Sequence, residues 1–139
     1  MSRTAAREVA MMILYSGLVG GTDTPDAVCE KADGIRPLDE TDTVYAKEIV
    51  AGVTEKAEEI DRVIGEHAVG WSLDRISRVD LSILRVAIYE MRWREDVPTG
   101  AAINEAVEMA KKYGGEKSFA FINGILGTVA RQQETTDDQ

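Results

Sequence analysis

Residues that form catalytic sites, metal sites or disulfide bonds are scarce in this sequence. Its 139 residues include one cysteine, one histidine and three prolines. A single cysteine, Cys29, excludes an internal disulfide and is typical of a reduced compartment. No apolar run reaches the ~18 residues that a membrane span requires, and the N-terminus lacks the basic and apolar pattern of a signal segment. We therefore expect a cytoplasmic globular protein.

The same scarcity argues against an enzyme. A metal site needs several ligands that converge, and neither His67 nor Cys29 stands in a spacing that would build one. The glycine-rich stretch over residues 17–22 lacks the lysine and the preceding strand of a phosphate-binding loop, so we interpret it as the end of a helix. Acidic pairs such as Glu58 and Glu59 fit the solvated face of an amphipathic helix. The sequence predicts no catalytic residue, no metal site and no cofactor.

Sustained alternation of apolar and polar residues, the mark of a strand, is also missing. The apolar spacing instead predicts helices over residues 3–19, 26–32, 39–53, 58–68, 81–93 and 98–113, with a last helix from Ser118. The helix over 81–93 is apolar around most of its circumference, which predicts a central, buried position. We expect an all-α fold. Its length fits one domain over residues 1–139, with an N-terminal half over 1–70 and a C-terminal half over 71–139, starting at Trp71.

The net charge of −9 at first disfavours a nucleic-acid partner. The charge is uneven, however, because residues 23–70 carry 13 acidic against five basic side chains and account for nearly all of it. Salt confines the reach of a charge to roughly 10 Å, so a locally basic surface elsewhere can still bind RNA. The first helix and the stretch from Lys111 to Lys117 lie outside the acidic segment.

The first predicted helix offers one such surface. Arg3, Arg7, Met11 and Tyr15 step by four residues, which places them within an arc of ~120° roughly opposite the apolar side. Two guanidinium groups and a phenol ring along ~18 Å of helix suit a single RNA strand, whose phosphates meet the cations while a base stacks on the ring. The alternative is an exposed face with ordinary charges.

Two phenylalanines in the last predicted helix cannot both face the core, because Phe119 and Phe121 point ~200° apart. If Ile122 and its helical repeats define the core, Phe119 joins them and Phe121 stands to one side. Phe121 is then a candidate base-stacking platform beside Lys117. The alternative for Phe121 is a packing contact with a neighbouring helix.

Charged residues within the central helix need partners, because an unpaired buried charge is costly. We expect Arg85 and Glu90 to bond each other or to reach partners on other helices, such as Glu105. Asp80, at the start of the same helix, either caps it or faces a partner protein.

Taken together, several ordered segments carry a resemblance to a known family. They are Ala6-Arg7-Glu8 with Leu14-Tyr15-Ser16, the run from Asp80 to Glu90, Pro98, the run from Ile103 to Lys111, Tyr113-Gly114, and Ser118 with the run from Phe121 to Leu126. Their order and spacing resemble the NusB family of transcription antitermination factors. The resemblance covers nearly the whole chain and is weakest from about residue 21 to residue 40.

The resemblance implies an all-α fold of two three-helix bundles packed across each other. It also implies a protein that binds the boxA element of nascent RNA together with the ribosomal protein NusE. That assembly belongs to an RNA polymerase antitermination complex that acts on ribosomal RNA operons. The matching positions imply RNA contacts at Arg3, Arg7, Tyr15 and Phe121, and a NusE contact at Asp80. Lys117, beside Phe121, is a further RNA-binding candidate, at a position where some family members carry an acid.

The arginine content departs from the family pattern. The first helix holds only Arg3 and Arg7, where members often carry a denser arginine cluster. We therefore expect weak RNA binding by the chain alone and a strong dependence on NusE. The alternative is a protein-only adaptor or a homodimer with little RNA binding. A related helical module occurs in certain ribosomal RNA cytosine methyltransferases, but that enzyme reading requires a cofactor-binding domain that this sequence does not contain.

Overall fold

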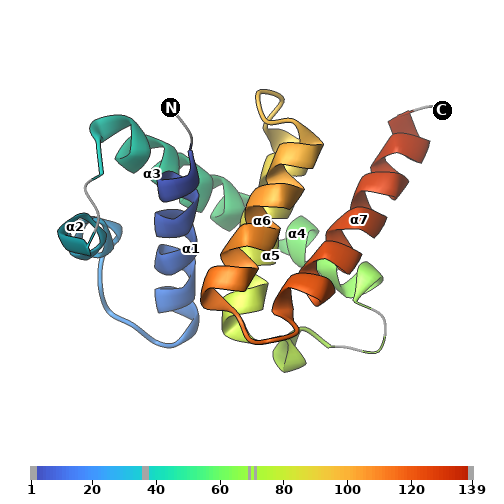
Figure 1. The fold of residues 1–139 in the computed structure, drawn as a ribbon, viewed down its shortest axis with the longest axis horizontal. Coiled ribbons are helices and arrows are strands. Elements are labelled where there is room, and N and C mark those ends of the chain that lie inside the picture. Colours follow the sequence, from blue (N-terminus) through green and yellow to red (C-terminus); the bar gives the residue numbers. More distant parts are fainter. Residues whose placement is uncertain (1–2, 36–37, 69, 71, 138–139) are drawn as a thin grey trace.

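The computed structural model describes residues 3–35, 38–68, 70 and 72–137 of the protein, and this part of the chain is helical without a strand. The helices are α1 (Thr4–Leu18), α2 (Pro25–Ile35), α3 (Glu40–Glu55), α4 (Ala57–His67), α5 (Arg78–Trp93), α6 (Thr99–Tyr113) and α7 (Ser118–Asp137), with a short 3-10 turn, η1 (Leu73–Arg75), before α5 (Figure 1). Each helix that the apolar spacing predicts is present, so the prediction of an all-α fold is confirmed.

Local signals in the sequence explain where several helices begin and end. Asp39 caps α3 with a reciprocal capping box that includes Asp42, and Ser77 caps α5 by accepting the backbone N–H of Asp80 at 3.1 Å. Pro98 precedes the first residue of α6, where its missing N–H costs nothing. After α1 the chain turns at Gly20, whose φ of 79° lies in the left-handed region that glycine adopts most easily.

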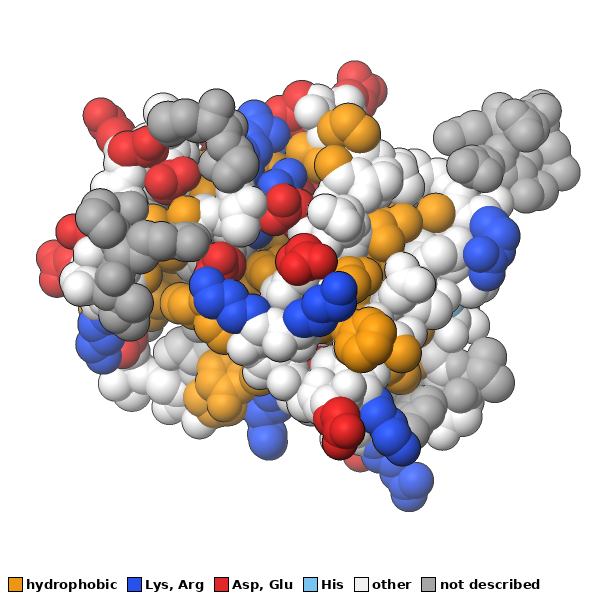
Figure 2. All heavy atoms as spheres, in the orientation of Figure 1, with side chains coloured by type: hydrophobic (Ala, Val, Ile, Leu, Met, Phe, Trp, Pro, Cys, Tyr) orange, Lys and Arg blue, Asp and Glu red, His pale blue; other side chains and the backbone are white. Residues whose placement is uncertain are grey.

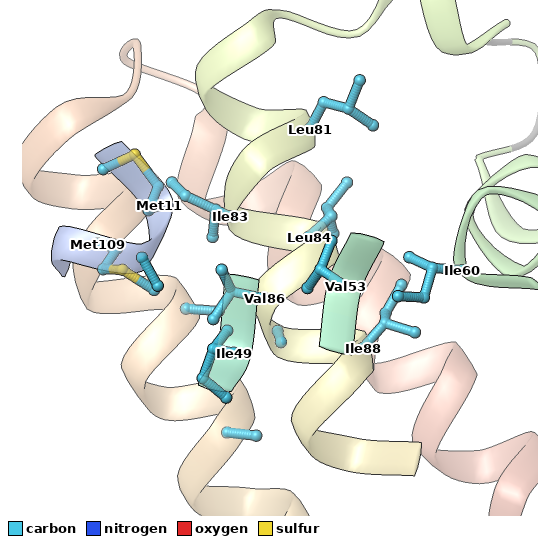
Figure 3. Close-up of a cluster of buried hydrophobic side chains, with 14 of the residues drawn as sticks. Met11, Ile49, Val53, Ile60, Leu81, Ile83, Leu84, Val86, Ile88 and Met109 are labelled. Atoms are coloured by element: carbon cyan, nitrogen blue, oxygen red, sulfur yellow. The ribbon is translucent and has the colours of Figure 1, made fainter. Parts of the chain in front are cut away.

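The hydrophobic core is built around α5. This helix contacts α1, α3, α4, α6 and α7, and its Ile83, Leu84, Val86 and Ile88 are fully buried. Figure 3 shows side chains converging on it from Met11 of α1, Ile49 and Val53 of α3, Ile60 of α4 and Met109 of α6. The sequence prediction that this helix is central and buried is therefore confirmed. Apolar residues surround the helix axis, so each side of the helix is stabilised by packing against a neighbour.

The expected division of the chain into two halves falls at Trp71, which lies outside the described residues. The buried apolar side chains on both sides of that point belong to one continuous cluster. The division into residues 1–70 and 71–139 stays a prediction. Among the residues that the structure describes, none of the helices combines the length and the hydrophobicity of a membrane span.

Candidate RNA and partner interface

The predicted RNA-facing arc on α1 is not an exposed stripe. Arg7 and Met11 are only 6% and 3% exposed, because α1 contacts α2, α3 and α5 and also reaches α6 through Glu8. The helical-wheel prediction that these two side chains face solvent is wrong. An amphipathic pattern on one helix shows where the apolar side lies, but it does not show how many neighbours cover the polar side.

Arg7 instead takes part in a buried ion pair with Glu90 of α5. The Arg7 Nε lies 2.8 and 2.9 Å from the two carboxylate oxygens of Glu90, which is 1% exposed. The hydroxyl of Tyr45, on α3, donates a hydrogen bond to the same carboxylate. Burial raises the pKa of Tyr45 above its ordinary value, and its hydrogen bond to Glu90 adds to the rise, so the phenol stays protonated. One carboxylate thus joins α1, α3 and α5.

The charge of Arg7 is preserved in this setting. Burial alone would lower the pKa of the Arg7 guanidinium, but the hydrogen bond and the charge of Glu90 outweigh it, and the pKa is raised. Glu105 of α6 lies 3.9 Å from the Arg7 Nη1 and also accepts a hydrogen bond from the hydroxyl of Thr4 at 3.0 Å. The cation is therefore matched by carboxylates within the protein.

Of the two alternatives expected for Arg85 and Glu90, the second is confirmed, because they do not bond each other but reach partners on other helices. Five residues along an α-helix turn the side chains ~140° apart, so the two point to different neighbours. Arg85 instead makes a two-pronged ion pair with Asp61 of α4, at 3.0 Å for each hydrogen bond. Glu105 does serve as a partner, although for Arg7 and Thr4.

Arg3 is the part of the predicted arc that stays accessible, with a side chain 40% exposed. Its guanidinium lies 4.2 Å from the centroid of the Tyr45 ring and pairs with Asp96 at 3.0 Å. Arg94 also lies over the Tyr45 ring, at 4.9 Å, and pairs with Asp96. Tyr15, at the other end of α1, is half-buried and packs against the core.

The remaining predicted residues come together in one place. A surface hollow of ≈ 670 Å³ lies between the start of α5 and the start of α7. It is lined by Arg75, Ile76, Ser77, Asp80, Gly115, Lys117, Ser118, Ala120 and Phe121. The predicted RNA contacts Lys117 and Phe121 thus share a hollow with the predicted NusE contact Asp80, although about 40 residues separate them in the sequence.

Asp80 does not act as the helix cap, because Ser77 holds that position. Its carboxylate lies in the first turn of α5, where the helix dipole favours a negative charge. The side chain is 8% exposed, and its Oδ1 accepts no hydrogen bond from the described residues. A buried carboxylate oxygen without a donor from the surrounding residues is unusual in a folded protein.

The two phenylalanines have exchanged their expected places. Phe119 is 43% exposed, whereas Phe121 is half-buried and packs against the core. The inward stripe of α7 contains Ser118, Ile122, Ile125, Leu126 and Val129, and both rings lie about 80° from its centre, on opposite sides. Phe121 faces the start of α5 across the hollow and packs against the core, whereas Phe119 lies beside Lys111 of α6.

Two exposed lysines of α6 are functional candidates that the sequence analysis noted only as lying outside the acidic segment. Lys111 and Lys112, in the last turn of α6, are both exposed. Their signal in the sequence is the lysine pair outside the acidic segment. The described residues hold no group of three or more His, Cys, Asp or Glu side chains arranged to bind a metal.

Comparisons of this chain with a family model and with known proteins agree on one family. Residues 4–131 match the model of the NusB family. The chain is 47% identical, over 131 residues, to the transcription antitermination protein NusB of Acetivibrio thermocellus, with 94% of this chain and 90% of the relative covered. It is 41% identical to the protein of the same name from Ruminiclostridium cellulolyticum, with 100% and 97% covered.

Solved structures agree with the sequence relatives. NusB of T. maritima superposes with a TM-score of 0.82 at 32% identity, covering 94% of this chain and 92% of that one. A crystal structure of the antitermination factors NusB and NusE in complex with double-stranded RNA contains a chain with a TM-score of 0.79 at 27% identity, covering 94% and 96%.

The fold and these matches define the class of protein, which is an all-helical transcription factor and not an enzyme. The chain belongs to the NusB family of transcription antitermination proteins.

Proposed function

We propose that this chain binds the boxA element of single-stranded RNA jointly with ribosomal protein NusE, in the cytoplasm, as part of an RNA polymerase antitermination complex on ribosomal RNA operons. The proposal rests on the hollow in which Lys117 and Phe121 lie beside Asp80. A cation and a ring suit a phosphate and a base, while a buried carboxylate suits a hydrogen-bond donor from a protein. The solved complex of a similar chain with NusE and RNA supports the same pair of partners.

The charges of α1 support a dependence on NusE. Arg7 is buried against Glu90, and Arg3 pairs with Asp96, so neither guanidinium is a free cation for phosphate. Affinity for a nucleic acid depends largely on the number of phosphates that a protein neutralises. With a net charge of −9, the chain alone offers few such contacts, and we expect the partner to supply the rest.

The experiment is a titration of fluorescently labelled boxA RNA with the protein, with and without NusE, at two salt concentrations. Affinity should rise with NusE, exceed that for a scrambled strand, and fall with salt. Lys117→Ala should weaken binding and lower the salt slope by about 0.7, the value for one phosphate contact on a single strand. Lys31→Ala, an exposed lysine on α2 paired with Asp23, is the matched control and should bind as the wild type does.

Asp80→Asn tests the partner side of the hollow. It should weaken the capture of NusE while leaving the weak RNA affinity of the isolated chain unchanged. If the folded wild-type protein binds no RNA under either condition, the RNA proposal is wrong and the protein-only adaptor remains. A mass that grows with protein concentration in sedimentation, and that RNA suppresses, would instead favour a homodimer that covers the site.

A further inference from the structure

An exposed aromatic ring stands at the start of α7, next to the last turn of α6. Among the residues that the structure describes, three large apolar side chains are exposed, and Phe119 is the only aromatic one of the three. Lys111 places its Nζ 5.7 Å from the centroid of the Phe119 ring, within the range of a cation–π contact. The fold does not need this ring, because α7 already buries five apolar or small side chains on its inward stripe.

Both lysines and acidic residues lie around Phe119. Lys111 and Lys112 come from α6, and Lys117 comes two residues before the ring. Figure 2 shows blue and orange side chains side by side over the lower end of α6 and the start of α7. Two nearby acids, Glu108 and Glu116, are also exposed, and Glu108 lies 3.5 Å from Lys111.

Lys112 is held in place by an ion pair with α1. Its Nζ lies 2.9 Å from Glu8 of α1 and 5.2 Å from the centroid of the Tyr113 ring, and the Tyr113 hydroxyl donates a hydrogen bond to the same carboxylate. Glu8 is buried, and its carboxylate pairs with the Lys112 ammonium group and offsets part of its charge. The hydrogen bond to Glu8 raises the pKa of Lys112, which keeps the ammonium group charged at neutral pH.

An exposed ring in contact with an ammonium group has the chemistry of a platform for single-stranded nucleic acid. Every base has a face that can stack on an aromatic ring, and the adjoining phosphates are attracted to lysines. An apolar peptide would find a single exposed ring here, because the adjoining hollow beside Lys111 and Lys112 is lined mostly by polar and charged side chains. The exposed ring beside the Lys111 ammonium group therefore favours a base and its phosphate.

We propose that Phe119, with Lys111 and Lys112, forms a second stacking platform for the same RNA strand, separate from the hollow at Phe121. The inference rests on the proposed RNA-binding function and extends it to α6. Phe119 and Phe121 point to opposite sides of α7, so a strand that contacts both crosses the N-terminal end of this helix beside Lys117. The second platform binds the part of the RNA that lies outside the segment held at Phe121.

Phe119→Ala and Phe119→Trp test the stacking. In complexes with NusE, Phe119→Ala should weaken binding of a long boxA RNA about tenfold, within the range seen when a base loses one aromatic partner. Phe119→Trp keeps a stacking face and should bind at least as tightly as the wild type. Since the ring is exposed, both variants should unfold at the same urea concentration as the wild type.

RNA length separates the two platforms. The titration is repeated with RNAs shortened from each end, and one series should lose the Phe119→Ala effect while the wild type still binds the shortened strand. Lys111→Ala should weaken binding of the long RNA only. Lys47→Ala, a similarly exposed lysine paired with Asp26 on the far acidic segment, is the matched control and should have no effect.

The outcomes distinguish this inference from the proposed function. If wild-type protein with NusE binds boxA RNA and Phe119→Ala binds RNAs of every length equally well, the second platform does not exist although the function stands. If Phe119→Ala weakens NusE capture and not RNA affinity, the ring belongs to a protein contact and the inference is wrong. If the wild type binds no RNA, the proposed function fails first.

Discussion

Arg7→Met is the substitution that best tests the buried ion pair between α1 and α5. It removes the guanidinium that donates to Glu90 at 2.8 and 2.9 Å and keeps a side chain of similar length. Glu90 then remains buried with the hydroxyl of Tyr45 as a donor but without a balancing cation next to it. A buried carboxylate in that state is either forced to bind a proton or destabilises the fold.

The expected cost follows from the burial of both partners. Removing one member of a buried, hydrogen-bonded pair destabilises a protein by about 3–5 kcal/mol, against a total stability of about 5–15 kcal/mol. With a urea dependence of about 2 kcal/mol per molar, the midpoint should fall by about 2 M. The double variant Arg7→Met with Glu90→Leu should recover up to about 3 kcal/mol relative to the sum of the single changes, because no charge is left alone.

The assay is urea unfolding followed by circular dichroism, with the four proteins of this cycle compared at one pH. The RNA titration is run on the same samples at a temperature where each is folded. If Arg7→Met unfolds within about 0.5 kcal/mol of the wild type, as an exposed substitution would, while its RNA affinity collapses, then Arg7 contacts RNA and the buried pair is refuted.

Three further substitutions test other parts of the structure. Ile88→Ala in the fully buried centre of α5 should cost about 2–5 kcal/mol in urea unfolding, and a loss below about 1 kcal/mol would contradict its central place. Gly20→Ala should lower stability by about 1 kcal/mol, because φ there is 79°; an unchanged melting temperature would show that the turn takes another conformation. Hydrogen bonds from Arg94 and Arg3 hold the pKa of Asp96 below its usual range. The contribution of Asp96 to the free energy of unfolding is therefore complete above the unfolded pKa of about 3.9, and it is lost as the pH falls through the lower pKa of the folded state. The urea midpoint of the wild type should therefore approach that of Asp96→Asn as the pH drops below about 4, and two midpoints that stay equally far apart would contradict this.

Family membership and the helices were accessible from the sequence because both depend on ordered local patterns. The run from Asp80 to Glu90 shows the principle, since its apolar residues surround the helix axis and predict α5 at the centre of the core. The breaks at Gly20 and Pro98 likewise mark helix ends through backbone preferences that need no knowledge of neighbours.

The candidate site was predicted only in part. Lys117, Phe121 and Asp80 were each named from the sequence, and the structure places them around one hollow, which no spacing along the chain could have indicated. Their roles toward RNA and NusE stay predictions. The prediction that Arg7 and Met11 lie on an exposed arc was wrong, because several helices pack against α1.

What the sequence determined by itself is the set of helices, their apolar sides and the family. Only the tertiary structure decided which polar side chains remain at the surface. Arg7 is buried because Glu90 and Tyr45 meet it from two other helices, whereas Phe119 stays exposed although it lies as close to the inward stripe of α7 as Phe121 does. A helical pattern defines directions around one axis, whereas exposure depends on which other axes pack against it, and that is set by contacts between residues far apart in the chain.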